Sequence, residues 1–308
     1  MLQRYKYHFV LHVIIFVWGF TALLGRWIET GAFTLVFYRV LIAFVSLLLF
    51  MILLKRKLFI LSKRLSFRTL GVGIIVALHW LTFFLSIKSS SASLAIICLA
   101  TTTIHVSWLE PIVMSRKFQL SELFLGCIIV SGILLITQNI EGENNFTGIF
   151  YGLISALLAA MFSVFNAHLI REVPASKITL YEMFSATLIS GAFVLYLGGG
   201  DLNLFRISPN DFWLLLFLGV VCTSIAFLVT VEIVKHLGAF TVSLSINMEP
   251  IYTLILAAWL LGEHKELTLW FYVGSLIILF AVFGDSLIKH QLKKRKMLRK
   301  QKLEKLKS

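Results

Sequence analysis

The residues able to do chemistry in this chain are a few ionisable and polar side chains set inside long apolar stretches. Glu249 directly precedes Pro250 within an apolar run over residues 240–261, and Arg39 lies early in another over 32–54. An ionisable group inside a membrane helix costs roughly 2.5–3.5 kcal/mol on insertion scales, so each one calls for a reason. Proline frees a backbone carbonyl one turn earlier, and a carboxylate beside such an opened helix can bind a cationic group or carry a proton. The alternative for Glu249 is a protonated acid hydrogen-bonded to a neighbouring helix. Arg39 could hold a substrate carboxylate, pair with a glutamate or snorkel outward.

Other polar and aromatic residues fall at similar depths in their own apolar runs. Trp18 lies at mid-depth, unlike Trp27 and Trp213, which suit the aromatic belt at a membrane surface. The histidines at mid-run either hydrogen-bond structurally, satisfying one another, or relay protons and line a cavity. We therefore expect a substrate site drawn from Glu249, Asn247, Arg39, Tyr38, Trp18, His79, Trp80, Thr102 and His105.

Signatures of other chemistry are missing from the sequence. It has no HExxH metal pair, no glycine-lysine phosphate loop and no cluster of catalytic carboxylates. His8 and His12 have the spacing of metal ligands but no third ligand beside them, so neither a metal nor a cofactor is expected. The cysteines Cys98, Cys127 and Cys222 stand singly in apolar stretches, where we expect small buried side chains rather than disulfides.

Composition requires a lipid environment for these runs. Of the 308 residues, 59% are hydrophobic and only 14% are charged, which is too little polar surface to cover a soluble core of this size. Runs of this length predict helices, because a barrel would show shorter alternating segments. We predict an all-α polytopic membrane protein with ten transmembrane helices, over residues 9–28, 32–54, 69–87, 92–113, 120–138, 147–169, 178–198, 212–234, 240–261 and 267–288.

The basic residues predict the orientation of these helices. Of the 28 lysines and arginines, 23 fall in alternate loops and at the two termini, 4 fall on the other side, and Arg39 lies within a run. The positive-inside rule then places both termini in the cytoplasm of a multi-pass protein of the inner (plasma) membrane. The net charge of +13 is thus a topology signal and does not indicate nucleic-acid binding. Glu182, Glu232 and Asp285 fall near cytoplasmic helix ends, where we expect water within reach and solvated or structural roles.

A weak internal repeat divides the chain into halves. Leu70-Gly71-Val72 aligns with Leu218-Gly219-Val220, and Gly126 aligns with Gly274, at one offset that corresponds to five helices. Because five is odd, the halves would cross the membrane in opposite senses, as in the inverted repeats of many secondary transporters. This predicts a first repeat over 1–140, a second over 141–288 and a basic cytoplasmic tail over 289–308. The similar triplets at 109–111 and 248–250 do not fit that offset, and we interpret them as coincidence.

Several local patterns resemble a known family. Trp18-Gly19, Arg39, Gly126 with Gly132, and Pro250 followed by Gly262-Glu263 are similar, in order and spacing, to the EamA-type branch of the drug/metabolite transporter superfamily. The first half departs from the pattern, since its fourth run has no central proline and does not end in Gly-Glu.

The resemblance implies a secondary transporter that exports or exchanges small metabolites such as amino acids. It would work by alternating access around a midplane cavity, with no nucleotide motor. The partners expected are a small-molecule substrate and the lipid bilayer, with proton coupling and a homodimer left open and no nucleic acid. The alternatives are a lipid flippase or scramblase on the same scaffold, or an intramembrane enzyme.

Overall fold

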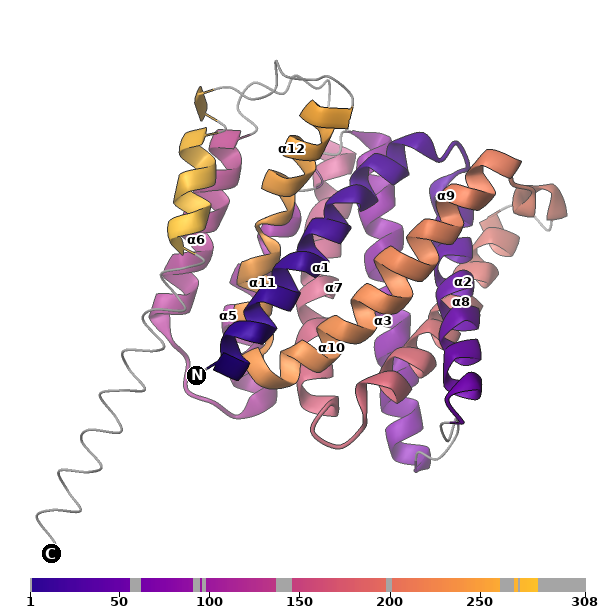
Figure 1. The fold of residues 1–308 in the computed structure, drawn as a ribbon, viewed down its shortest axis with the longest axis horizontal. Coiled ribbons are helices and arrows are strands. Elements are labelled where there is room, and N and C mark those ends of the chain that lie inside the picture. Colours follow the sequence, from indigo (N-terminus) through magenta and orange to yellow (C-terminus); the bar gives the residue numbers. More distant parts are fainter. Residues whose placement is uncertain are drawn as a thin grey trace, which may run out of the picture.

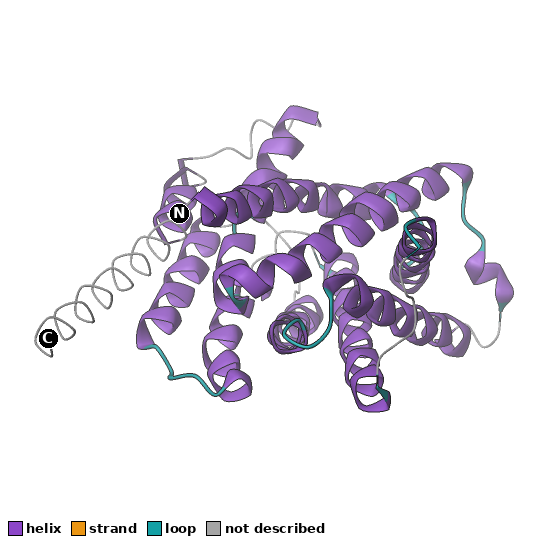
Figure 2. Cartoon of the chain, turned by 60° about the horizontal axis from the view of Figure 1, so that its bottom comes forward, coloured by secondary structure: helices purple, strands orange, loops and turns teal. Residues whose placement is uncertain are grey.

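The computed structural model describes residues 2–55, 62–90, 95, 98–136, 146–197, 201–260, 269–270 and 272–281. All regular structure in this part of the chain is helical (Figures 1 and 2). The elements are α1 (Leu2–Trp27), α2 (Ala32–Leu53), α3 (Lys63–Ser89), α5 (Thr102–Met114), α6 (Leu120–Ile136), α7 (Phe146–Leu169), α8 (Ala175–Leu197), η1 (Leu202–Phe205), α9 (Pro209–Gly219), the π-helix η2 (Val220–Ile225), α10 (Ala226–Leu237), α11 (Ala239–Ile246) and α12 (Glu249–Leu260).

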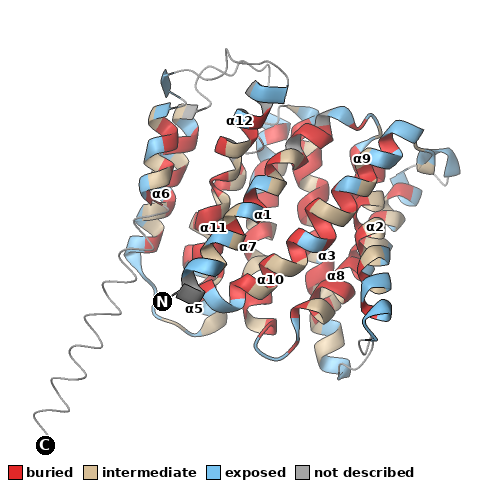
Figure 3. Cartoon of the chain, in the orientation of Figure 1, coloured by how far each residue is buried: buried red, intermediate tan, exposed pale blue. Residues whose placement is uncertain are grey.

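The helices have the length and surface of a membrane protein. Six of them are long and apolar enough to cross a bilayer, namely Tyr5–Gly25, Ala32–Leu53, Lys63–Ser89, Phe146–Leu169, Ala175–Leu197 and Pro209–Leu237; the shorter apolar helices Leu120–Leu135 and Tyr272–Ala281 accompany them. Large hydrophobic side chains such as Phe67, Phe146 and Phe280 are three-quarters exposed on the outside of the bundle. Buried residues gather where the helices face one another (Figure 3). The protein is therefore a polytopic helical membrane protein, since lipid is the solvent that accepts this surface.

Two of the predicted runs are not single regular helices. The run over 212–234 is one continuous rod from α9 to α10 with a π-helical turn at Val220–Ile225 in its middle. The run over 240–261 breaks at Asn247 and Met248, whose amides bond to carbonyls only three residues back, at 3.3 and 3.0 Å. Pro250 lies just beyond and cannot continue the regular ladder, which explains the break.

Small residues bring the central helices into close contact. Helix α3 packs against α7 and α8, and a Cβ on Gly73 would lie 2.6 Å from the Cα of Glu182. On α7, a Cβ on Gly152 would lie 2.6 Å from the Cβ of Cys98, and Ala156 and Ala160 are fully buried. These small residues on α7 therefore allow close helix packing.

The bundle has one strongly basic end, at the bottom of Figure 1. We call it the basic end; the N-terminus and the junctions α2–α3, α5–α6, α7–α8 and α10–α11 lie there. Its described basic residues are Arg4, Lys6, Lys55, Lys63, Arg64, Arg68, Arg116, Lys117, Arg171, Lys177 and Lys235, against Arg26, Lys88 and Arg206 at the opposite end.

Candidate functional site

A cavity of about 130 Å³ opens in the middle of the bundle. This is several times the roughly 10–15 Å³ that a single water needs, so there is room for a small solute. Its walls come from both predicted halves of the chain. Residues of the predicted site that line it are Glu249, Asn247, Arg39, Trp18, His79, Trp80 and Thr102.

Arg39 is buried in the cavity wall and held on two sides. Its Nε donates to Thr223 Oγ1 at 2.8 Å, and its guanidinium carbon lies 4.3 Å from the centre of the Trp80 ring. A cation over a desolvated aromatic face is stabilised by about 2 kcal/mol. The terminal nitrogens of Arg39 bond to no described residue. The side chain is thus fixed in place while its outer edge stays available to a carboxylate.

The π-helical turn explains how Arg39 and Trp18 are anchored. Thr223 Oγ1 donates to the Leu218 carbonyl five residues back, at 2.7 Å, and Trp18 Nε1 donates to the Cys222 carbonyl at 2.9 Å. A π-turn leaves such carbonyls without their usual amide partners, and turns of this kind are frequent at functional sites. The turn therefore converts a stretch of transmembrane backbone into a polar wall of the cavity.

Glu249 begins α12 immediately after the helix break and lines the same cavity as Arg39. Its carboxylate forms no hydrogen bond or ion pair with a described residue, so it is not paired with Arg39 directly. Asn247, two residues earlier, donates to Thr103 Oγ1 at 2.7 Å and to the Ser243 carbonyl at 3.0 Å, which ties the broken helix to α5. Opposite charges in one water-poor cavity stabilise each other over several ångströms.

His79 and the aromatic residues form the remaining wall. The Nδ1 of His79 lies 3.0 Å from the Ser155 carbonyl and 2.9 Å from the Ser155 hydroxyl, which anchors the ring to α7. Its ring lies 5.3 Å from that of Phe162, and Phe227 completes the wall 5.8 Å from Trp80. The cavity thus combines aromatic walls with one basic and one acidic side chain.

Two predicted residues lie elsewhere. Tyr38 donates its hydroxyl to the Phe205 carbonyl at 2.5 Å, at the end opposite the basic end, since adjacent residues on α2 point about 100° apart and only Arg39 points into the cavity. His105 packs edge-on against Trp108, and its Nδ1 is buried without a hydrogen-bond partner among the described residues. His79 and His105 form no hydrogen bond with each other.

Sequence reasoning also missed residues and misplaced others. Cys222 and Asn166 also line the cavity; Cys222 does not stand out in an apolar run, whereas Asn166 is a polar side chain within one and could have been selected on that ground. Cys127 is exposed, against the expectation that all three cysteines are buried. Glu182 is fully buried rather than within reach of water, because α3 packs directly over it. Asp285, Gly262-Glu263 and the tail lie outside the described residues.

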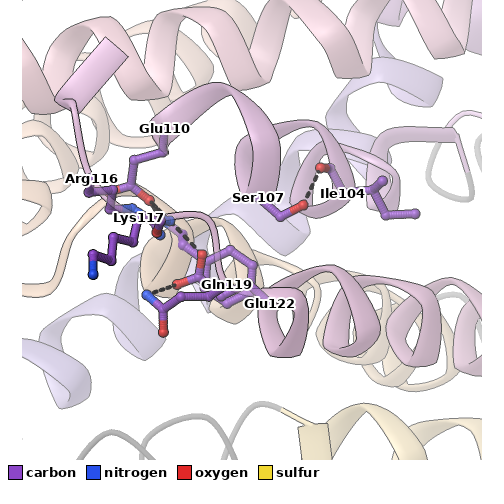
Figure 4. Close-up of polar contacts among 8 residues, drawn as sticks. Ile104, Ser107, Glu110, Arg116, Lys117, Gln119 and Glu122 are labelled. Atoms are coloured by element: carbon purple, nitrogen blue, oxygen red, sulfur yellow. Dashed lines mark hydrogen bonds and ion pairs between the residues drawn. The ribbon is translucent and has the colours of Figure 1, made fainter. Parts of the chain in front are cut away.

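A second cluster of polar side chains lies at the basic end and connects α5 and α6 to the start of α11. Arg116 Nη2 contacts both Glu110, at 2.9 Å, and Glu122 (Figure 4). Glu110 also accepts the backbone N–H of Phe240 at 3.2 Å. Gly238 permits this approach, since its φ of 83° turns the chain sharply between α10 and α11. We call Glu110, Arg116, Glu122 and the Phe240 amide the basic-end latch.

Charge holds the latch together. Burial by itself lowers the pKa of Arg116, but the hydrogen bonds and negative charges of Glu122 and Glu110 outweigh it and raise that pKa above its ordinary value. The arginine therefore stays protonated at any physiological pH. The start of α11 adds the positive end of a helix dipole beside Glu110.

A model of the EamA-like transporter family matches residues 6–138 and, a second time, residues 146–286. The chain belongs to this family. Among similar proteins, an uncharacterized inner membrane transporter, YicL of Salmonella typhimurium, is 27% identical over 213 residues, covering 67% of this chain and 68% of YicL. An uncharacterized transporter of Archaeoglobus fulgidus is 23% identical over 302 residues, covering 93% of this chain and 99% of its own. One crystal structure shares the fold with a TM-score of 0.74 at 12% identity, covering 92% of this EamA-like chain and 98% of the other. Membership places the chain among membrane transporters.

Proposed function

We propose that this EamA-like protein is a secondary transporter that exports or exchanges small metabolites such as amino acids by alternating access to the central cavity. The observation that carries the proposal is the pair of opposite charges in one cavity, each without a partner for its outer atoms among the described residues. The outer edge of Arg39 suits a carboxylate, and Glu249 suits an ammonium group. A zwitterion of amino-acid size could engage both.

The proposed architecture is ten transmembrane helices in two inverted five-helix repeats, over residues 1–140 and 141–288. The double match of the family model supports two related halves. The cavity draws Arg39 from the first half and Glu249 from the second. Substrate sites between repeats, at discontinuous helices, are typical of secondary transporters.

Contacts between the proposed halves lie at both ends of the bundle. At the basic end, Glu110 of the first half accepts the Phe240 amide of the second at 3.2 Å. At the opposite end, Asp211 of the second half accepts the amides of Glu29 and Thr30 of the first, at 3.0 and 3.2 Å. Rocking of one half against the other would break one set of contacts while keeping the other. Such alternative contacts suit a two-state device.

The basic end is proposed to face the cytoplasm, with both termini on that side. The charge asymmetry between the two ends supports this orientation. The basic-end latch then lies on the cytoplasmic side.

Counterflow in proteoliposomes tests the proposed function. Vesicles loaded with a mixture of the standard amino acids should take up a radiolabelled trace of the same mixture faster than empty liposomes. Glu249→Gln, which keeps the shape and removes the charge, should slow this exchange at least tenfold. Glu29→Gln, the same change on a residue outside the cavity lining, should leave it unchanged. No exchange by the wild-type protein would overturn the amino-acid assignment, and exchange of labelled phospholipid in its place would favour a lipid carrier.

A further inference from the structure

A second carboxyl group is buried beside the cavity, in a place that the proposed substrate site does not use. Glu182, in the first half of α8, has no exposed surface. Its one hydrogen-bond partner among the described side chains is Asn166, whose Nδ2 lies 3.4 Å from Glu182 Oε2. Its other oxygen, Oε1, is buried without a partner.

The surroundings of Glu182 hold several buried polar atoms without partners. Asn166 Oδ1 is also buried and without a partner, and so is the hydroxyl of Thr179, one turn before Glu182 on the same face of α8. An ionised carboxylate here would be a buried charge with a single hydrogen bond of 3.4 Å, at a cost of several kcal/mol. A proton on Glu182 removes that charge, so the pocket fits the neutral acid.

No base on the surrounding helices neutralises Glu182 through an ion pair. The elements packed against α8 are α2, α3, α10 and η1, and Asn166 comes from α7. Of these, η1 has no ionisable side chain. On the others, the described cationic and titratable groups are Tyr38, Arg39, Lys63, Arg64, Arg68, His79, Lys88, Tyr151, His168, Glu232, Lys235 and His236, and α8 itself adds Lys177, Tyr181 and Tyr196. None of the cationic groups forms an ion pair with Glu182.

Asn166 connects this carboxyl to the central cavity. It lines the cavity wall while contacting Glu182 behind it. On the other side, the backbone of α8 at Glu182 is sealed by α3, since a Cβ on Gly73 would lie 2.5 Å from the Glu182 carbonyl oxygen. Asn166 therefore links Glu182 to the cavity.

We propose that Glu182 and Asn166 form a proton-binding site of this transporter, separate from Glu249, that couples substrate movement to a proton gradient. In the described state Glu182 holds the proton as a neutral carboxylic acid. When the cavity side opens and water reaches Asn166, the O–H bond breaks, the proton passes to water and the carboxylate remains. This inference rests on the proposed transport function and adds its coupling ion.

The test compares two transport modes in the same proteoliposomes, with the amino-acid mixture as probe. A gradient of one pH unit coupled to one proton supports an accumulation of about tenfold. Wild type should accumulate the label, whereas Glu182→Gln should lose accumulation, reaching a ratio of one, and keep counterflow. Glu232→Gln makes the same change on a half-exposed glutamate that pairs with His236 at the basic end, and it should behave like wild type. Accumulation of the label that persists in Glu182→Gln would overturn the proposed proton site. Accumulation by the wild type that a sodium gradient drives and a proton gradient does not would overturn it as well.

Infrared spectroscopy separates failure of this inference from failure of the proposed function, because it needs no substrate. At neutral pH, purified wild-type protein in nanodiscs should show a protonated-carboxyl band that disappears in Glu182→Gln and persists in Glu232→Gln. A wild-type spectrum identical to that of Glu182→Gln in this region would mean that Glu182 is ionised. That result would overturn the inference whatever the transport assays give.

Discussion

Removing Arg116 should release the basic-end latch and open that end of the protein. Arg116 side-chain exposure is 24%, and those of Glu110 and Glu122 are 9% and 4%. Removing one partner from a buried ion pair costs roughly 3–5 kcal/mol, because the remaining charges stay buried and uncompensated. Since Arg116 is partly exposed and water screens its charge, we expect about 2 kcal/mol. If the latch exists only while the basic end is closed, Arg116→Ala shifts the closed-to-open ratio by about 30-fold.

The chain contains its own reporter for this opening. Cys222 lines the cavity and is buried, so a membrane-impermeant maleimide should reach it only when one end opens. In a background of Cys98→Ser and Cys127→Ser, everted vesicles expose the basic end in the proposed orientation. Arg116→Ala should raise the rate of Cys222 labelling there by up to about 30-fold, and lower it in right-side-out vesicles.

The neighbouring Lys117→Ala is the matched control. Lys117 is exposed and only its backbone carbonyl contacts Arg116, so labelling should stay at the wild-type rate. An unchanged rate in a folded Arg116→Ala protein, or an equal rise in Lys117→Ala, would refute the idea that this ion-paired group holds the basic end closed.

Three further substitutions follow from the packing of the cavity and its walls. Gly73→Ala places a Cβ against the backbone of α8 and should destabilise the protein by at least the roughly 1–3 kcal/mol of an overpacked core. Gly71→Ala is the control: a Cβ there would have no atom within 4 Å, so its melting temperature should equal or exceed that of the wild type. Equal melting temperatures for the two variants would contradict the close approach of α3 and α8. Thr223→Val removes the acceptor of the Arg39 Nε hydrogen bond and should cost about 1.5–3 kcal/mol of unfolding free energy, and an unaltered unfolding curve would show that the bond does not form. Trp80→Leu removes the ring beneath Arg39 and should weaken solute binding in titration calorimetry several-fold, while Trp80→Phe keeps most of the affinity; equal losses would exclude the cation–π contact.

The helical membrane class and the cavity wall were largely predictable from the sequence, since both depend on where polar residues interrupt apolar runs. The break at Asn247 and Met248 follows from Pro250, and the mid-depth position of Trp18 predicted a cavity residue. The depth of Arg39 left outward snorkelling open, and the structure instead buries its side chain in the cavity wall. In each case a costly residue in lipid identifies the place where the fold must supply a partner.

What the sequence could not reveal depends on helix rotation and on backbone irregularity. Tyr38 and Arg39 are adjacent, yet on a helix they point in directions about 100° apart, and only Arg39 reaches the cavity. The π-turn at 220–225 has no distinctive residue pattern, although it holds Arg39 and Trp18 in place. Glu182 was expected near water from its position in the run, but the packing of α3 over it through Gly73 is a long-range contact.

Binding of a small solute between Arg39 and Glu249 is the central claim, and a thermal-shift screen tests it most directly. The purified protein is melted against a metabolite library as wild type and as Glu249→Gln. A bound solute at a hundredfold excess over its dissociation constant should stabilise the fold by about 2.7 kcal/mol. We predict that zwitterionic solutes stabilise the wild type and lose this effect in Glu249→Gln. Stabilisation that is equal in both proteins would place the binding site elsewhere and contradict the account.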